Sequence, residues 1–187
     1  PAFGAVFTYY LSEGMETKAS MRKKAEKEAL KADKNISFPS WDELEAERRQ
    51  GQPKIWLTIK DQDGKVVRRM NGPSSKGMHR VAWDFRRNGK NGISLRRGSG
   101  NRWRGGGFMA LPGDYTLTIS KEVEGQITQL TEPKAFKVER LYKGALPVQE
   151  EAKIDAFRVE LEDFVQEMSA VNYMMNQSMD RAAAMQT

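Results

Sequence analysis

The chain has 187 residues, no cysteine, one histidine and a formal net charge of +6 at neutral pH. Its apolar fraction of 39% and charged fraction of 30% are typical of a globular domain. No apolar run approaches the roughly 18 residues of a membrane span, and no signal peptide is recognisable. The composition excludes disulfides, cysteine nucleophiles and metal sites built from several histidines. Because the chain begins at Pro1, we expect it to be part of a longer protein with a further domain upstream.

The N-terminal part predicts one strand followed by two helices. Residues 4–11 are rich in aromatic and β-branched side chains and alternate as in a strand, with one face formed by Ala5, Phe7, Tyr9 and Leu11. Residues 15–35 are rich in Lys, Glu and Ala with few apolar positions, which predicts an exposed or partly disordered helix. Ser40 and Glu43 have the spacing of a capping box, so a second helix is expected to follow and to end near Gly51.

The middle of the chain predicts a series of short strands. Each candidate strand shows alternating polarity, and the strands cover about 53–61, 66–72, 78–85, 111–123 and 132–141. Asp63-Gly64 is a strong hairpin signal between the first two of them. Asp61 and Asp63 also suggest a calcium loop, but the other ligands of that motif are missing, so the hairpin is favoured. Six or seven strands separated by turns predict an antiparallel β-sandwich.

The C-terminal part predicts a helix of about 35 residues, which at 1.5 Å per residue is about 50 Å long. Its apolar residues recur at spacings of three and four and form a stripe: Ile154, Phe157, Leu161, Phe164, Met168, Val171, Met175 and Met179. The helix is longer than a sandwich of this size covers, so part of the stripe is expected to contact another helix. That helix belongs to the 15–50 region, to a second copy of the chain or to sequence outside it.

Charge is unevenly distributed. No acidic residue occurs between Asp84 and Asp114, where seven basic residues lie, whereas from Gln149 onward eight acids oppose three bases. The candidate binding residues of this basic loop are Arg86, Arg87, Arg96, Arg97, Arg102, Trp103 and Arg104. They suit phosphates, carboxylates or a stacked ring. The alternatives are a solvated loop and a loop that docks onto the acidic C-terminal helix or onto the domain expected upstream.

His79 is expected to share a strand face with Val81, Trp83 and Phe85. We therefore interpret it as part of the domain wall, with its ring hydrogen-bonded to a neighbouring strand or loop, rather than as a general base, because no nucleophile accompanies it in the sequence. Asp84 points the other way and is expected to fix the start of the basic loop by accepting backbone N–H bonds.

Several of these elements resemble a known family. The stretch "KIWLTIKDQDGKVVRRMNGPSSKGMHRVAWDF" followed by "LPGDYTLTI" is similar to the immunoglobulin-like domain of flagellar hook-capping proteins. The family's G-x-H-x-V-x-W-D strand is matched by Gly77, His79, Val81, Trp83 and Asp84, and its P-G-x-Y strand by Pro112, Gly113, Tyr115 and Ile119. With "FGAVFTYYL", "FPSWDELE" and the long helix, residues 3–142 resemble more closely the C-terminal region of bacterial sortilin-like proteins with a BNR-repeat β-propeller. The basic loop departs from the family pattern.

The resemblance implies a mainly β protein: an immunoglobulin-like sandwich over 1–142, a helical insert at about 14–50 and an amphipathic helix over 147–187. It further implies a non-enzymatic accessory domain without cofactor or metal, exported to the periplasm, the outer membrane or the medium. Its expected partner is the upstream domain of the same polypeptide or another protein, with a homo-oligomer through the helix as a further possibility. The alternative function is carbohydrate binding through Trp103 or Trp56; nucleic-acid binding by the loop ranks third.

Overall fold

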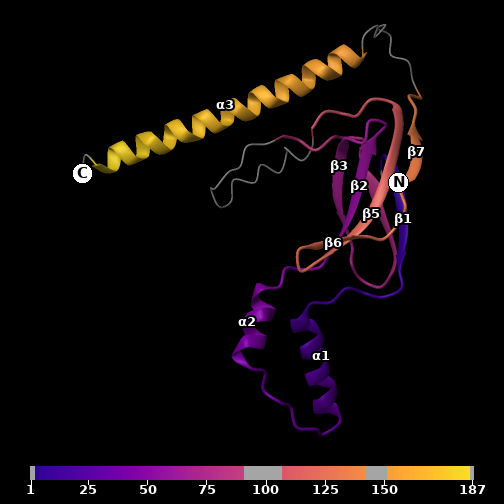
Figure 1. Ribbon diagram of the computed structural model, residues 1–187, viewed down its shortest axis with the longest axis vertical. Coiled ribbons are helices and arrows are strands. Elements are labelled where there is room, and N and C mark those ends of the chain that lie inside the picture. Colours follow the sequence, from indigo (N-terminus) through magenta and orange to yellow (C-terminus); the bar gives the residue numbers. More distant parts are fainter. Residues whose placement is uncertain (1–2, 91–106, 142–150, 186–187) are drawn as a thin grey trace. The chain divides into compact units, whose positions relative to one another are not determined.

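The computed structural model describes residues 3–90, 107–141 and 151–185 (Figure 1). The chain divides into two compact units, which we call the sandwich unit (Pro1–Asp84 and Asp114–Phe136) and the helix unit (Phe85–Gly113 and Lys137–Thr187). The elements in chain order are β1 (Ala5–Leu11), α1 (Lys18–Lys31), α2 (Trp41–Arg49), β2 (Lys54–Asp61), β3 (Val66–Gly72), β4 (Gly77–Trp83), β5 (Gly113–Val123), β6 (Gln126–Gln129), β7 (Lys134–Val138) and α3 (Glu151–Met185).

The strands form two antiparallel sheets in a sandwich-like arrangement, which confirms the predicted antiparallel β-structure. In the smaller sheet β1 pairs with β4, from Ala5 opposite Trp83 to Leu11 opposite Gly77. The larger sheet has the order β3-β2-β5-β6, and β7 also pairs with β5. Within the described residues there are seven strands, of which β6 was not expected from the sequence.

The hairpin between β2 and β3 is built around Asp61. Its carboxylate accepts backbone N–H bonds from Asp63 at 3.1 Å and from Lys65 at 2.9 Å. Gly64 has φ +76°, a left-handed conformation that side chains other than glycine rarely adopt. The structure therefore confirms the hairpin, and a carboxylate that a calcium site would require is engaged by the turn itself.

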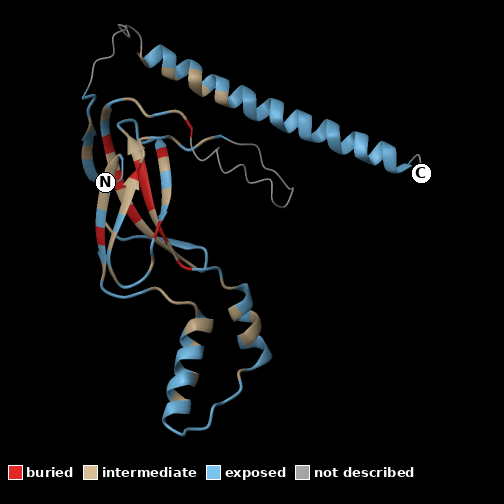
Figure 2. Cartoon of the chain, turned by 180° about the vertical axis from the view of Figure 1, so that it is seen from behind, coloured by how far each residue is buried: buried red, intermediate tan, exposed pale blue. Residues whose placement is uncertain are grey.

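The core lies between the two sheets and is centred on Trp83, which is fully buried. Its ring centroid is 5.4 Å from that of Tyr115 and 6.1 Å from that of Phe136, while Phe136 lies 5.2 Å from Phe7. These edge-to-face contacts join the β1–β4 sheet to the larger sheet. Figure 2 shows the buried residues concentrated in the strands. In β2, Ile55, Leu57 and Ile59 are fully buried.

His79 belongs to the wall of the sandwich, as the alternation predicts. Its ring lies 5.3 Å from the ring of Tyr9, and its Nε2 is 2.6 Å from the carbonyl oxygen of Ser75 in the loop before β4. The prediction was wrong for Phe85: β4 ends at Trp83, and Phe85 has φ +60°, which turns the backbone out of the strand. The interaction expected of Asp84 stays a prediction.

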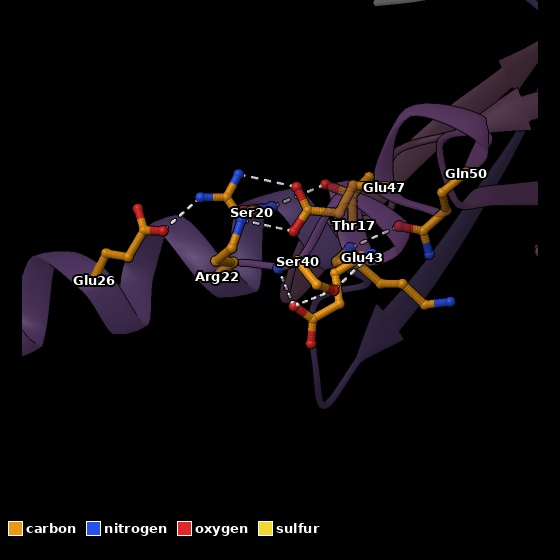
Figure 3. A network of polar contacts seen from close by, with 9 residues as sticks. Thr17, Ser20, Arg22, Glu26, Ser40, Glu43, Glu47 and Gln50 are labelled. Atoms are coloured by element: carbon orange, nitrogen blue, oxygen red, sulfur yellow. Dashed lines mark hydrogen bonds and ion pairs between the residues drawn. The ribbon is translucent and has the colours of Figure 1, made fainter. Parts of the chain in front are cut away.

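The helical insert forms a hairpin held by polar contacts (Figure 3). The predicted capping box is confirmed, since the backbone N–H of Ser40 donates to Glu43 Oε2 at 2.8 Å and the Glu43 N–H donates to Ser40 Oγ at 3.3 Å. Between the helices, Arg22 donates to both carboxylate oxygens of Glu47 at 2.7 and 2.9 Å. Neither helix has a buried residue. Charge pairing and capping therefore contribute much of the hairpin's order, because little apolar surface is buried there.

This hairpin is expected to loosen in acid. The hydrogen bonds from Arg22 lower the pKa of the Glu47 carboxyl below its usual value of 4.5. Because the folded-state pKa is the lower one, the pair stabilises the hairpin above about pH 4.5, and this contribution is lost as the pH falls through the folded pKa. Amide hydrogen-exchange protection in α2, measured by NMR between pH 6 and pH 3 (roughly the range of carboxyl titration) and referred to the intrinsic exchange rate at each pH, should fall in acid. Glu47→Gln should remove this transition, and an unchanged profile in that variant would contradict the assignment.

Candidate functional site

The ends of the basic loop meet in a short antiparallel ladder within the helix unit. The Arg87 N–H donates to the Phe108 carbonyl at 2.9 Å, and the Gly107 N–H donates to the Arg87 carbonyl at 2.9 Å. The Ala110 N–H donates to the Phe85 carbonyl at 2.7 Å. We call residues 85–90 with 107–110 the loop base.

Helix α3 attaches to the loop base through ionic contacts. Arg87 Nη2 donates to Asp155 Oδ2 at 2.7 Å, and the two side chains are only 19% and 13% exposed. Lys90 forms a second ion pair with Asp163, which is more exposed. Arg158 lies over the ring of Phe108, with its guanidinium carbon 5.5 Å from the ring centroid. Asp155 and Asp163 of α3 thus neutralise two cations at the start of the basic loop, Arg87 and Lys90.

The approach between helix and loop base is close at Gly107. A Cβ atom on this buried residue would lie 2.8 Å from Glu162 Oε1 and 3.1 Å from the Asn88 carbonyl oxygen, so glycine leaves room for the Glu162 carboxylate. Within the described residues, Asp155 Oδ1 is buried without a hydrogen-bond partner, whereas Oδ2 accepts from Arg87. The Arg87–Asp155 pair is therefore better shielded from water than the Lys90–Asp163 pair.

The face of α3 that is covered is charged. Its partly buried residues are Glu151, Asp155, Arg158, Val159 and Glu162, and every residue described after Glu162 is exposed. At 3.6 residues per turn, the apolar stripe Ile154–Met179 lies about 130° around the helix axis from this covered face. Its eight side chains are 40–63% exposed. Figure 2 shows most of α3 coloured as exposed. Most surface helices bury their apolar face, so α3 has the reverse arrangement.

The structure places only part of the predicted basic binding loop. Arg86 and Arg87 lie in the loop base, whereas Arg96, Arg97, Arg102, Trp103 and Arg104 lie outside the described residues. The ion pairs of Arg87 and Lys90 agree with docking of the loop onto the acidic helix. Sequence reasoning did not select Lys90, Asp155 or Asp163, although the opposite charge of the two segments pointed to such pairing.

Trp56, a candidate for carbohydrate stacking, is already engaged. Its indole Nε1 donates to Glu122 Oε2 at 2.5 Å. The Lys54 ammonium and the Arg69 guanidinium carbon lie 5.6 and 5.8 Å from its ring centroid. A sugar stacking on this ring would compete with cation–π contacts, and Trp103 lies outside the described residues.

A groove of about 510 Å³ lies between α1 and α2 and is lined in part by Phe38, Arg22 and Glu47. Its charged side chains contact one another or nearby residues: Arg22 pairs with Glu47, and Lys18 pairs with Glu124. Because these pairs hold the insert together, we do not take the groove as a ligand site. The apolar stripe of α3 is the stronger candidate for a functional surface.

Comparison of the chain with protein families, with curated proteins and with solved structures finds no match. Within the described ranges, no helix has the length and hydropathy needed to cross a bilayer. The same residues contain no cluster of three or more metal-ligating side chains.

Proposed function

We propose that the chain is a non-enzymatic interaction domain of a larger exported bacterial protein, with an immunoglobulin-like sandwich that packs beside a β-propeller or a partner helix. The observation that carries this proposal is the orientation of α3. The helix attaches to its own chain through charged residues such as Asp155 and leaves its apolar stripe exposed.

The exposed stripe has the properties of a binding surface. Fully burying one large aliphatic or aromatic side chain contributes about 1.5–3 kcal/mol, so eight half-exposed side chains leave a considerable gain unused in a lone chain. Contiguous apolar patches on soluble proteins commonly mark interaction sites. Spacings of three and four along one helix match the seam of a helix–helix interface. A second protein surface, above all another helix, is the partner that fits.

The sandwich supports the immunoglobulin-like part of the proposal. Three features fall at the motif positions of the hook-capping pattern. They are the hairpin from Asp61 to Gly64, the row of His79, Val81 and Trp83 on β4, and the start of β5 at Gly113. Two further parts of the proposal come from the resemblance to bacterial sortilin-like proteins. These are export to the periplasm, outer membrane or medium, and a neighbouring β-propeller.

Site-specific photo-cross-linking tests the stripe as a protein contact. A photoreactive phenylalanine analogue replaces Phe164 in the stripe or, as the control, Gln166. Each variant is expressed in the cells that normally produce the protein, so that the natural partner is present. Two residues along a helix point about 160° apart, so the control is exposed on another face. We expect a discrete protein adduct from position 164, identified by mass spectrometry, and much less from 166. Equal yields or no adduct at 164 would contradict the proposal.

A further inference from the structure

We infer that the partner of the α3 stripe is the stripe of a second copy of this chain, running antiparallel, with Ile154 opposite Met185 of the partner subunit and Met168 opposite the partner's Val171. This inference rests on the proposed function and names the partner of the same surface.

The first argument is the repeat. The alternating spacing of three and four continues past Met175 when Ser178, Ala182 and Met185 are taken as the next positions. We call this extended row the seam; Met179 then lies beside it. The seam residues are then Ile154, Phe157, Leu161, Phe164, Met168, Val171, Met175, Ser178, Ala182 and Met185. A strict seven-residue repeat keeps one seam facing one partner helix as the two supercoil. α3 keeps that repeat over nearly its whole length of 35 residues.

The second argument is side-chain size. The first half of the seam is bulky, with Phe157, Leu161 and Phe164, whereas most of the second half is slim or flexible, with Ser178, Ala182 and two methionines. A parallel pair sets each bulky residue against its own copy and each small residue against another small one. The antiparallel register instead sets Phe157 against Ala182 of the partner subunit and Leu161 against the partner's Ser178. Layers of similar total volume pack with fewer voids.

Ser178 fits an apolar seam because its hydroxyl already has a partner. Its Oγ donates to the Met174 carbonyl oxygen at 2.9 Å, within the same helix. Packing against the partner's Leu161 therefore leaves no unsatisfied hydroxyl, which is the usual cost of burying serine.

The third argument is charge complementarity beside the seam. In a parallel pair, Lys153 lies beside Arg158 of the partner subunit, which places like charges together. In the antiparallel register, Glu160 lies beside the partner's Arg181, and the two-fold axis repeats this attractive pair. Residues 168–179 are uncharged, so the acidic first half of each helix faces a neutral stretch rather than another acidic one.

The loop base leaves the seam free. The loop-base contacts of α3 are made by the charged face that includes Asp155 and Glu162, about 130° from the stripe. One copy of α3 therefore contacts its own loop base and a second α3 at the same time.

Cysteine cross-linking tests both the partner and the direction, because the chain has no cysteine of its own. Ile154→Cys and Met185→Cys are made separately, checked for retained helix by circular dichroism, and oxidised alone or after mixing. In the antiparallel register Cα atoms at 154 and 185 of opposite copies come within disulfide reach. Two copies of residue 154 are about 47 Å apart, as 31 residues at 1.5 Å each require.

We expect a disulfide-linked dimer in the mixture and its loss when either variant is oxidised alone; Gln166→Cys, off the seam, should not link in any combination. Efficient self-linking of Ile154→Cys would show a parallel pair and overturn the inferred direction. Folded variants that link in no combination would overturn self-association. In that last case a Phe164 photo-adduct with a different protein would still support the proposed function, so the two failures are distinguishable.

Discussion

Replacing Trp83 by alanine is expected to lower the free energy of unfolding by about 3–5 kcal/mol, a large share of the roughly 5–15 kcal/mol typical of a domain. The indole is fully buried and contacts Tyr115 and Phe136 across the two sheets. Its removal leaves a cavity that the β1–β4 sheet, with only two strands, has little means to close.

Urea unfolding monitored by circular dichroism measures this loss. The matched control is Trp41→Ala, because Trp41 is 85% exposed in the helical insert and its loss should change stability by no more than about 0.5 kcal/mol. Equal unfolding midpoints for the two variants would show that Trp83 does not join the sheets as described.

Replacing Asp155 by alanine is expected to detach the start of α3 from the loop base. The substitution removes the carboxylate to which Arg87 donates, and hydrogen bonds to charged groups contribute about 1.5–3 kcal/mol when well shielded from water. A loss of about 2 kcal/mol corresponds to an about 30-fold larger equilibrium population of the opened contact, and to a similar increase in amide exchange through it. Amide hydrogen exchange over residues 152–163 is the appropriate measurement.

Asp163→Ala is the control for this prediction. The Lys90–Asp163 pair is 38% and 51% exposed, and exposed pairs contribute less than about 1 kcal/mol. Exchange in the first turns of α3 should therefore change only about fivefold or less in that variant. The ranking of the two variants tests whether the shielded pair holds the helix; similar acceleration in both would contradict it.

Alternation and turn chemistry were sufficient to predict most strands. Tyr9, His79 and Trp83 fall on the faces that the sequence indicates, and the capping box at Ser40 is formed. β6 was missed because all four of its residues, Gln126–Gln129, are exposed, so no apolar alternation marks it. The available signal was Glu124-Gly125, where both residues have positive φ as in a tight hairpin turn.

The site was only partly predictable. The length of α3 and its stripe follow from the spacing of apolar residues, and the helix has the expected 35 residues. The spacing does not reveal that Asp155 and Glu162 turn toward the loop base, because such pairing depends on which cations come within reach in three dimensions. The predicted helix–helix contact of the stripe itself stays a prediction.

The exposed stripe gives the most direct test, by light scattering after size-exclusion chromatography. The unaltered chain should have twice the molar mass of a single chain. Leu161→Glu combined with Phe164→Glu should yield the single-chain mass with its helix content largely retained, because charges in the seam destabilise the pair but not the loop-base contact. Gln166→Glu, on another face, should remain dimeric. A single-chain mass for the unaltered protein, or the same doubled mass for the double variant, would contradict the inferred pairing through α3.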